Sequence, residues 1–106
     1  MFTQVDVYDV VYTSSASPPK IFVEGSQGTG ALIFLPNGAP LPADSYLDTT
    51  TPDDDHYSPP EVTLYYHQED LGNIIELLER DRLIFLFWNG VGQANGLTTL
   101  DRNPGE

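Results

Sequence analysis

Two short apolar runs constrain the fold of this chain more than any other feature. ALIFL at 31–35 and LIFLFW at 83–88 are apolar at every position and rich in branched and aromatic residues. Both are too short for core helices, and Gly or Asn-Gly sequences lie beside them. Runs of this kind predict buried β-strands. We therefore expect a sheet to supply most of the core, with 31–35 as a central strand covered on both faces.

Four further segments have the composition or alternation of strands, namely 2–13, 20–24, 61–67 and 97–100. The first segment changes its apolar face near Tyr8 or Asp9, which predicts a bulge there. The glycine-rich loop GSQGTG at 25–30 joins two strand-like runs, so we expect a hairpin. Alternation in the 61–67 segment predicts a half-buried strand.

One helix is predicted, at about 70–81. Its apolar stripe has helical spacing and consists of Leu71, Ile74, Ile75, Leu77 and Leu78. Asp70 is a good N-cap residue, so we expect it to begin the helix. Glu76 and Arg80 are four residues apart in the favourable order, which predicts an ion pair on the outer side.

These elements indicate an α+β fold. We expect a mostly antiparallel curled sheet, or a small partly open barrel, of about six strands with the helix at about 70–81 packed on it. No alternation of strands and helices appears, so a parallel sheet is not expected. A chain of 106 residues fits a single globular domain, 1–106, with a long acidic loop rich in Pro and Thr at about 43–60.

The net charge restricts the kinds of partner. Sixteen acidic residues against four basic ones give a formal charge of −12. Such a field repels phosphate groups, which disfavours direct binding of nucleic acid or of anionic membranes. Three explanations for the acidity stay open: solubility, adaptation to a high-salt cytoplasm, or a docking surface for a basic partner.

The sequence carries no address signal that we can identify. There is no cysteine, and the N-terminus lacks the basic and apolar regions of a signal peptide. No apolar stretch approaches the ~18 residues of a membrane span. We therefore expect a cytoplasmic protein without a membrane partner. The Gly-Glu ending, soon after an expected strand, leaves open a longer natural chain.

No residue set indicates catalysis, a cofactor or a metal site. Adjacent Asp53, Asp54 and Asp55 do not match a calcium loop, which needs acidic residues at alternate positions and a distal Glu. His56 and His67 have no recognisable nucleophile partner. GSQGTG and GVGQANG lead into expected strands, whereas a phosphate-binding loop must open a helix. The enzyme hypothesis therefore has no positive support.

The leading functional hypothesis is a small, acidic, soluble, non-enzymatic protein-binding module, of the inhibitor or neutralising-partner type. Its partner would be another protein with a basic surface, because no Lys or Arg lies between Lys20 and Arg80. The expected acidic patch consists of Asp44, Asp48, Asp53, Asp54, Asp55 and Glu61. A second candidate set could form an aromatic contact or line a pocket: Tyr65, His67 and Trp88.

Two alternatives remain from the sequence. One is a small-ligand-binding or enzymatic domain, with its pocket between the sheet and the 43–60 loop. The other is a self-associating structural domain, in which an exposed strand edge pairs with a second copy to form a homo-oligomer.

Overall fold

The computed structural model describes residues 1–14, 17–48, 59–80 and 83–105. Within these ranges the strands are β1 (Phe2–Gln4), β2 (Val7–Val11), β3 (Lys20–Gly25), β4 (Gly28–Leu35), β5 (Ser45–Leu47), β6 (Glu61–His67), β7 (Phe85–Phe87) and β8 (Gly96–Thr98). A short 3-10 turn, η1 (Gln68–Asp70), leads into the helix α1 (Leu71–Glu79). The fold is therefore α+β, as expected.

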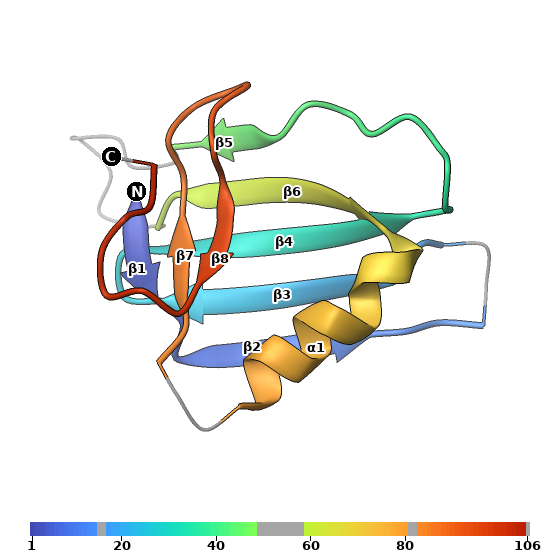
Figure 1. Ribbon diagram of the computed structural model, residues 1–106, viewed down its shortest axis with the longest axis horizontal. Helices are drawn as coiled ribbons and strands as arrows, with labels where there is room; N and C mark the ends of the chain where they lie inside the picture. The colour runs from blue at the N-terminus through green and yellow to red at the C-terminus, as the bar shows by residue number, and fades with distance from the viewer. Residues whose placement is uncertain (15–16, 49–58, 81–82, 106) are drawn as a thin grey trace.

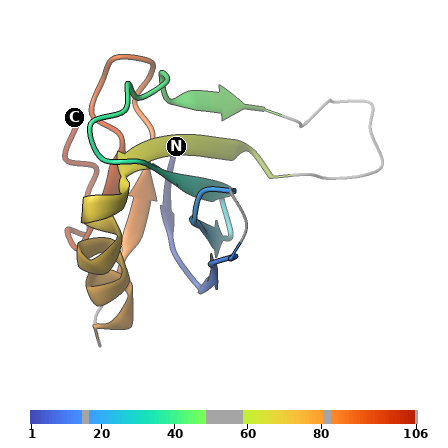
Figure 2. The same cartoon turned by 90° about the vertical axis from the view of Figure 1, so that its right-hand side faces the viewer.

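The strands form two sheets. One has five strands in the order β2-β3-β4-β6-β5, and the other has three in the order β1-β7-β8. The five-stranded sheet is mixed and does not close into a barrel. Helix α1 and the three-stranded sheet lie on the same side of the five-stranded sheet (Figures 1 and 2). One face of the larger sheet therefore supplies the core.

The core follows from alternation along the strands. On β3, β4 and β6 every second residue points to the covered face, where Ile21, Leu32 and Leu64 are almost fully buried. Leu78 of α1 and Leu86 of β7 complete the packing from the other side. The full cluster is Ile21, Val23, Leu32, Phe34, Val62, Leu64, Leu78, Ile84 and Leu86.

The N-terminal segment passes from one sheet to the other between Val5 and Asp6. The Val5 N–H donates to the Ile84 carbonyl oxygen at 2.8 Å, beside the three-stranded sheet. The Asp6 N–H donates to the Glu24 carbonyl oxygen at 2.7 Å, beside the five-stranded sheet. The predicted bulge near Tyr8 or Asp9 is therefore misplaced. The apolar face changes because the two halves belong to different sheets.

The two sheets meet closely where the β3–β4 turn faces β1. Thr3 is only 2% exposed, and its hydroxyl oxygen accepts the Gln27 N–H at 3.1 Å. A Cβ atom at Gly25 would collide with the Gln4 carbonyl oxygen and the Thr3 hydroxyl. Glycine at this position therefore allows the hairpin to lie directly on the backbone of β1.

The number and direction of the strands differ from the prediction. There are eight described strands rather than about six, and β4 and β6 pair in parallel from Thr29↔Glu61 to Leu35↔His67. Parallel neighbours need a long crossover, which is usually a helix. Here residues 36–60 make the connection, and β5 is the one strand or helix in its described part, 36–48 and 59–60. The sequence of this crossover has no helical signature.

The helix is shorter than predicted. It ends at Glu79, because Arg80 has extended dihedral angles, and residues 81–82 lie outside the described part of the chain. Asp70 occupies the N-cap position as predicted, but its side chain makes no capping hydrogen bond. Instead, η1 precedes the helix, and the Asn37 side-chain oxygen accepts the Glu69 N–H at 2.8 Å.

Other local predictions are confirmed in part. The apolar stripe of α1 packs on the core, and Arg80 contacts Glu76 at 3.0 Å. The β3–β4 hairpin forms, and β4 is central in its sheet. However, β4 is not covered on both faces, because Ile33 and Leu35 are only half-buried. The predicted 43–60 loop includes strand β5, and its residues 49–58 lie outside the described ranges.

Replacing Gly25 with Ala tests the contact between the sheets. We expect Gly25→Ala to lower the free energy of unfolding by about 1–3 kcal/mol, because the new methyl group overlaps backbone and Thr3 atoms. Gly72→Ala is the matched control, since nothing lies within 4 Å of a Cβ there and the residue is helical. It should stabilise by about 0.5–1 kcal/mol. Urea denaturation of both variants measures the difference, and equal effects would contradict this account.

Candidate interaction surface

One face of the five-stranded sheet has no described helix or strand packed on it. Side chains of residues paired across strands lie on the same face. The strand register therefore defines three rows and one shorter pair, Leu35 and His67, on this face, which we call the outer face. The first row is Val7, Glu24, Thr29, Glu61 and Leu47; the second is Asp9, Phe22, Ala31, Thr63 and Ser45; the third is Val11, Lys20, Ile33 and Tyr65.

The outer face combines exposed apolar side chains with acidic ones. Phe22 is 40% exposed although it lies on an interior strand, and Val7 and Leu47 at the two edges are more than half exposed. Glu24 and Glu61 are exposed in the same row. An exposed aromatic residue beside branched side chains and carboxylates is typical of a surface that meets another macromolecule.

The structure brings together part of the predicted acidic patch. Asp48 follows Leu47, which pairs with Glu61, so Asp48 and Glu61 lie close together where β5 ends and β6 begins. Asp44 precedes β5 and lies apart from them. Asp53, Asp54 and Asp55 lie outside the described residues, as does His56.

The carboxylate of Asp44 is engaged within the fold. Its Oδ1 atom accepts the Tyr65 N–H at 3.3 Å, on the part of β6 that extends beyond β5. Its Oδ2 atom accepts a hydrogen bond from Asn95 Nδ2 at 3.4 Å. Asp44 therefore ties the chain entering β5 to β6 and to the β7–β8 loop, which is a structural role that the charge pattern did not indicate.

A network of asparagine side chains holds the β7–β8 loop. Asn95 Oδ1 accepts the Asn89 N–H at 2.7 Å, and Asn95 Nδ2 donates to the Gly90 carbonyl oxygen at 2.9 Å. Asn89 and Asn103 exchange two side-chain hydrogen bonds, of 2.8 and 3.0 Å. Because a carboxamide both donates and accepts, this network fixes the loop and the C-terminal segment without charge.

The residues predicted as an aromatic contact or pocket lining do not all lie together. Trp88 is half-buried and stacks on Tyr46, with ring centroids 5.7 Å apart. The His67 Nε2 atom lies 2.8 Å from the Ala39 carbonyl oxygen, which ties β6 to the chain that follows β4. Tyr65 and His67 are two residues apart on β6, so both lie on the outer face. The structure therefore brings Tyr65 and His67 together, and Trp88 lies apart from them.

The phenol of Tyr66 has a raised pKa. Its ring stacks on Phe34 at 5.6 Å, on the covered face of the sheet. Burial raises the pKa of the Tyr66 phenol from 10.0 to about 12, and the negative charges of Asp44 and Asp70 add to the effect. The phenol therefore stays protonated at neutral pH.

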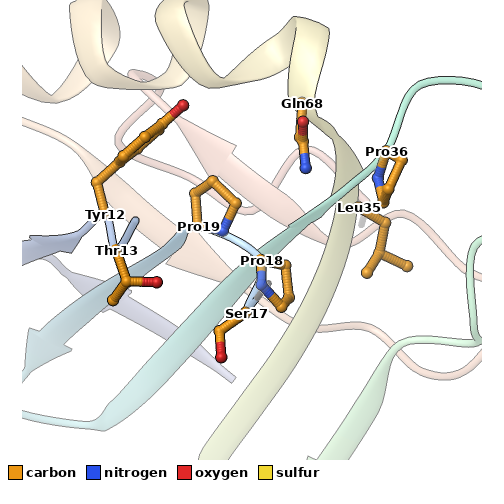
Figure 3. Close-up of a pocket in the computed structure, with 8 residues that line it drawn as sticks. All are labelled: Tyr12, Thr13, Ser17, Pro18, Pro19, Leu35, Pro36 and Gln68. Atoms are coloured by element: carbon orange, nitrogen blue, oxygen red, sulfur yellow. The ribbon is translucent and has the colours of Figure 1, made fainter. Parts of the chain in front are cut away.

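Two hollows lie at the ends of the larger sheet. The first, of about 420 Å³, is formed where β2, β4 and β6 end (Figure 3). Its lining combines apolar residues with polar residues that carry no charge: Tyr12, Thr13, Ser17, Pro18, Pro19, Leu35, Pro36 and Gln68. The second, of about 410 Å³, includes Asp44 and Tyr65 beside residues 91–93 of the β7–β8 loop. This second hollow borders the start of the 43–60 segment, and His67 is not among its lining residues.

Within the described ranges, no three His, Cys, Asp or Glu residues are grouped so that they could hold a metal ion. In the same ranges, no helix has the length and apolar character needed to cross a membrane.

Phe22 and Asp9 were not predicted as functional residues. KIFVE has the composition of an ordinary strand, and its alternation showed that Phe22 lies opposite Ile21 and Val23. Which side becomes the core depends on where the helix and the second sheet pack. The sequence feature that could have indicated Phe22 is a phenylalanine on the side of the strand opposite the one with Ile21 and Val23.

Comparison of the chain with protein-family models, with curated proteins and with solved structures found no match.

Ionisation of Tyr66 provides a pH prediction. Because the folded pKa is raised above the unfolded value, the native state keeps this proton more tightly, and stability should fall as pH rises from 10.0 towards about 12. Tyr66→Phe should remove this part of the slope, as measured by urea denaturation at several pH values. The difference in phenolate absorbance between wild type and Tyr66→Phe should have its midpoint near 12.

Tyr12→Phe is the control for this titration, because Tyr12 is 73% exposed. Its removal should leave the pH dependence of stability unchanged. If the difference in phenolate absorbance between wild type and Tyr66→Phe had its midpoint near pH 10, burial would not be raising the pKa of Tyr66.

Proposed function

We propose that this chain is a non-enzymatic protein-binding module that docks a basic protein on the outer face of its five-stranded sheet. The observation that carries this proposal is the exposure of Phe22 on an interior strand, within a row that runs from Asp9 to Ser45. The exposed acidic residues of the outer face, Asp9, Glu24 and Glu61, form an acidic border that favours a positively charged partner.

The apolar part of the surface supports affinity. Phe22 has Ala31 and Thr63 as neighbours in its row, and these small side chains leave its ring standing above the sheet. Partly exposed aromatic side chains surrounded by smaller residues are frequent anchors in protein interfaces. A partner that covers Phe22 together with Val7 and Val11 would remove a contiguous apolar strip from water.

The charges support selectivity and fast association. Asp9, Glu24 and Glu61 are exposed on the outer face, and Lys20 is the only cation in its three rows. The whole chain adds a field from its net charge of −12. Such a field accelerates encounter with a positively charged protein and opposes acidic partners.

A small-ligand-binding or catalytic function has less support. No charged side chain lines the larger hollow, and the carboxylate of Asp44 in the other hollow already accepts two hydrogen bonds from the protein. Ligand pockets normally combine an apolar lining with polar groups that are available to the ligand.

Phe22→Thr tests the contact surface. The substitution keeps strand propensity and removes the ring, so folding should persist while retention of a basic protein from host lysate falls by about tenfold. Leu100→Thr is the matched control, because Leu100 is also about half exposed, at 47%, but lies away from the outer face. Quantitative mass spectrometry of the retained protein gives the readout. Equal retention by both variants would refute docking on the outer face.

Charge neutralisation on the same face tests the acidic border. Glu24→Gln combined with Glu61→Gln should slow association of the retained partner several-fold at low ionic strength, with a smaller effect at high salt. Glu79→Gln combined with Asp101→Asn changes the net charge equally at exposed positions off the outer face. Stopped-flow or surface-plasmon kinetics compare the two pairs. The border has no role if both pairs slow association alike.

A further inference from the structure

Strand β2 is the longest free edge in the described part of the fold. It has five residues, Val7–Val11, and pairs only with β3. The other edge strands, β1, β5 and β8, have three residues each. An edge strand presents unpaired N–H and C=O groups at alternate residues, so β2 has the most backbone to offer an added strand.

This edge also lacks the usual protection. Edge strands commonly carry Lys, Pro or a bulge that prevents pairing with another chain. β2 has none of these within Val7–Val11, and Asp9 is its only charged residue. Side chains are exposed on both of its faces: Val7 and Val11 on the outer face are 51% and 39% exposed, and Val10 on the covered face is 41% exposed.

We infer that the β2 edge accepts an extended segment of a basic partner as a sixth strand, with a Lys or Arg of that segment opposite Asp9 and apolar residues opposite Val7 and Val11. The inference rests on the proposed function and narrows it. It states that the basic partner contributes a strand with a cation flanked at two-residue spacing by apolar side chains. Backbone hydrogen bonds supply affinity, and the alternating side chains supply selectivity.

The charge of Asp9 decides between the candidate occupants. Asp9 lies at the centre of β2 and has neither an ion pair nor a side-chain hydrogen bond with described residues. A cation directly opposite on an added strand would be a favourable cross-strand pair. In a second copy paired antiparallel about the centre of β2, Asp9 would face Asp9, and two chains of charge −12 would meet. The edge therefore favours a basic segment over self-association.

The added strand would continue the outer face. Asp9 is in register with Phe22, and Val7 and Val11 are in register with Glu24 and Lys20. Side chains of the sixth strand that lie opposite these β2 residues would extend the same three rows. The edge and the outer face thus make one surface, in which the edge aligns the partner and Phe22 anchors it.

A designed peptide tests the inference on the intact chain. The probe is the acetylated and amidated peptide KTVTKTVTK, whose central lysine and flanking valines match Asp9, Val7 and Val11. We expect binding to slow amide hydrogen exchange along β2, measured by NMR, while β5 and β8 keep their exchange rates. Unchanged exchange along β2 at about 1 mM peptide would overturn the inference.

A charge swap separates pairing from general attraction. Wild type should bind KTVTKTVTK about fivefold more tightly than KTVTETVTK, and Asp9→Lys should reverse this order. Glu79→Lys changes the net charge equally at an exposed helix position, so it should keep the wild-type order. The inference fails if both variants change the preference alike, because the attraction would then be non-specific.

Two further outcomes separate this inference from the proposed function. Exchange or shift changes confined to the neighbourhood of Phe22, with β2 unaffected, would overturn strand addition and leave docking on the outer face intact. Protection of β2 in the protein alone, together with a dimer in analytical ultracentrifugation, would assign the edge to a second copy and also overturn the inference. Loss of partner retention in Phe22→Thr tests the proposed function independently of the peptide.

Discussion

The contact of the β3–β4 turn with β1 organises the rest of the structure. Because Gly25 has no side chain and Thr3 accepts a hydrogen bond from the turn, the smaller sheet can lie against one end of the larger one. Helix α1 then fills the remaining area of the same face, with Leu78 reaching the core. The described elements that pack on the larger sheet therefore all lie on one side of it, and no described helix or strand covers the opposite side (Figures 1 and 2).

Much of the local structure follows from periodicity, whereas the pairing does not. Alternation in 61–67 correctly indicates which side of β6 is buried, and the stripe of α1 correctly indicates its core face. Strand β5 has three exposed residues, so it has no apolar pattern of its own and exists through its pairing with β6. The parallel direction of β4 and β6 is set by the path of residues 36–60, which composition does not encode.

The candidate site likewise has some features that the sequence predicts and others that depend on the assembled sheet. Charge counting predicted an acidic surface, and the structure brings Asp48 and Glu61 close together where β5 ends and β6 begins. It did not distinguish them from Asp44, whose carboxylate serves the fold through Tyr65 and Asn95. The importance of Phe22 and Asp9 depends on strand order and on the side taken by α1, which are properties of the assembled sheet rather than of a segment.

The asparagine network also bears on the chemical durability of the chain. Asn89 and Asn95 each precede glycine, a pairing in which the following backbone nitrogen can attack the side-chain amide and convert asparagine to aspartate through a cyclic imide. That attack requires the amide to leave its present partners, and both amides are held by several hydrogen bonds. Native packing therefore slows the covalent ageing of the β7–β8 loop. Once one amide is lost, a new carboxylate stands in the network that includes Asp44, so repulsion would loosen the loop and expose the remaining amide to the same reaction.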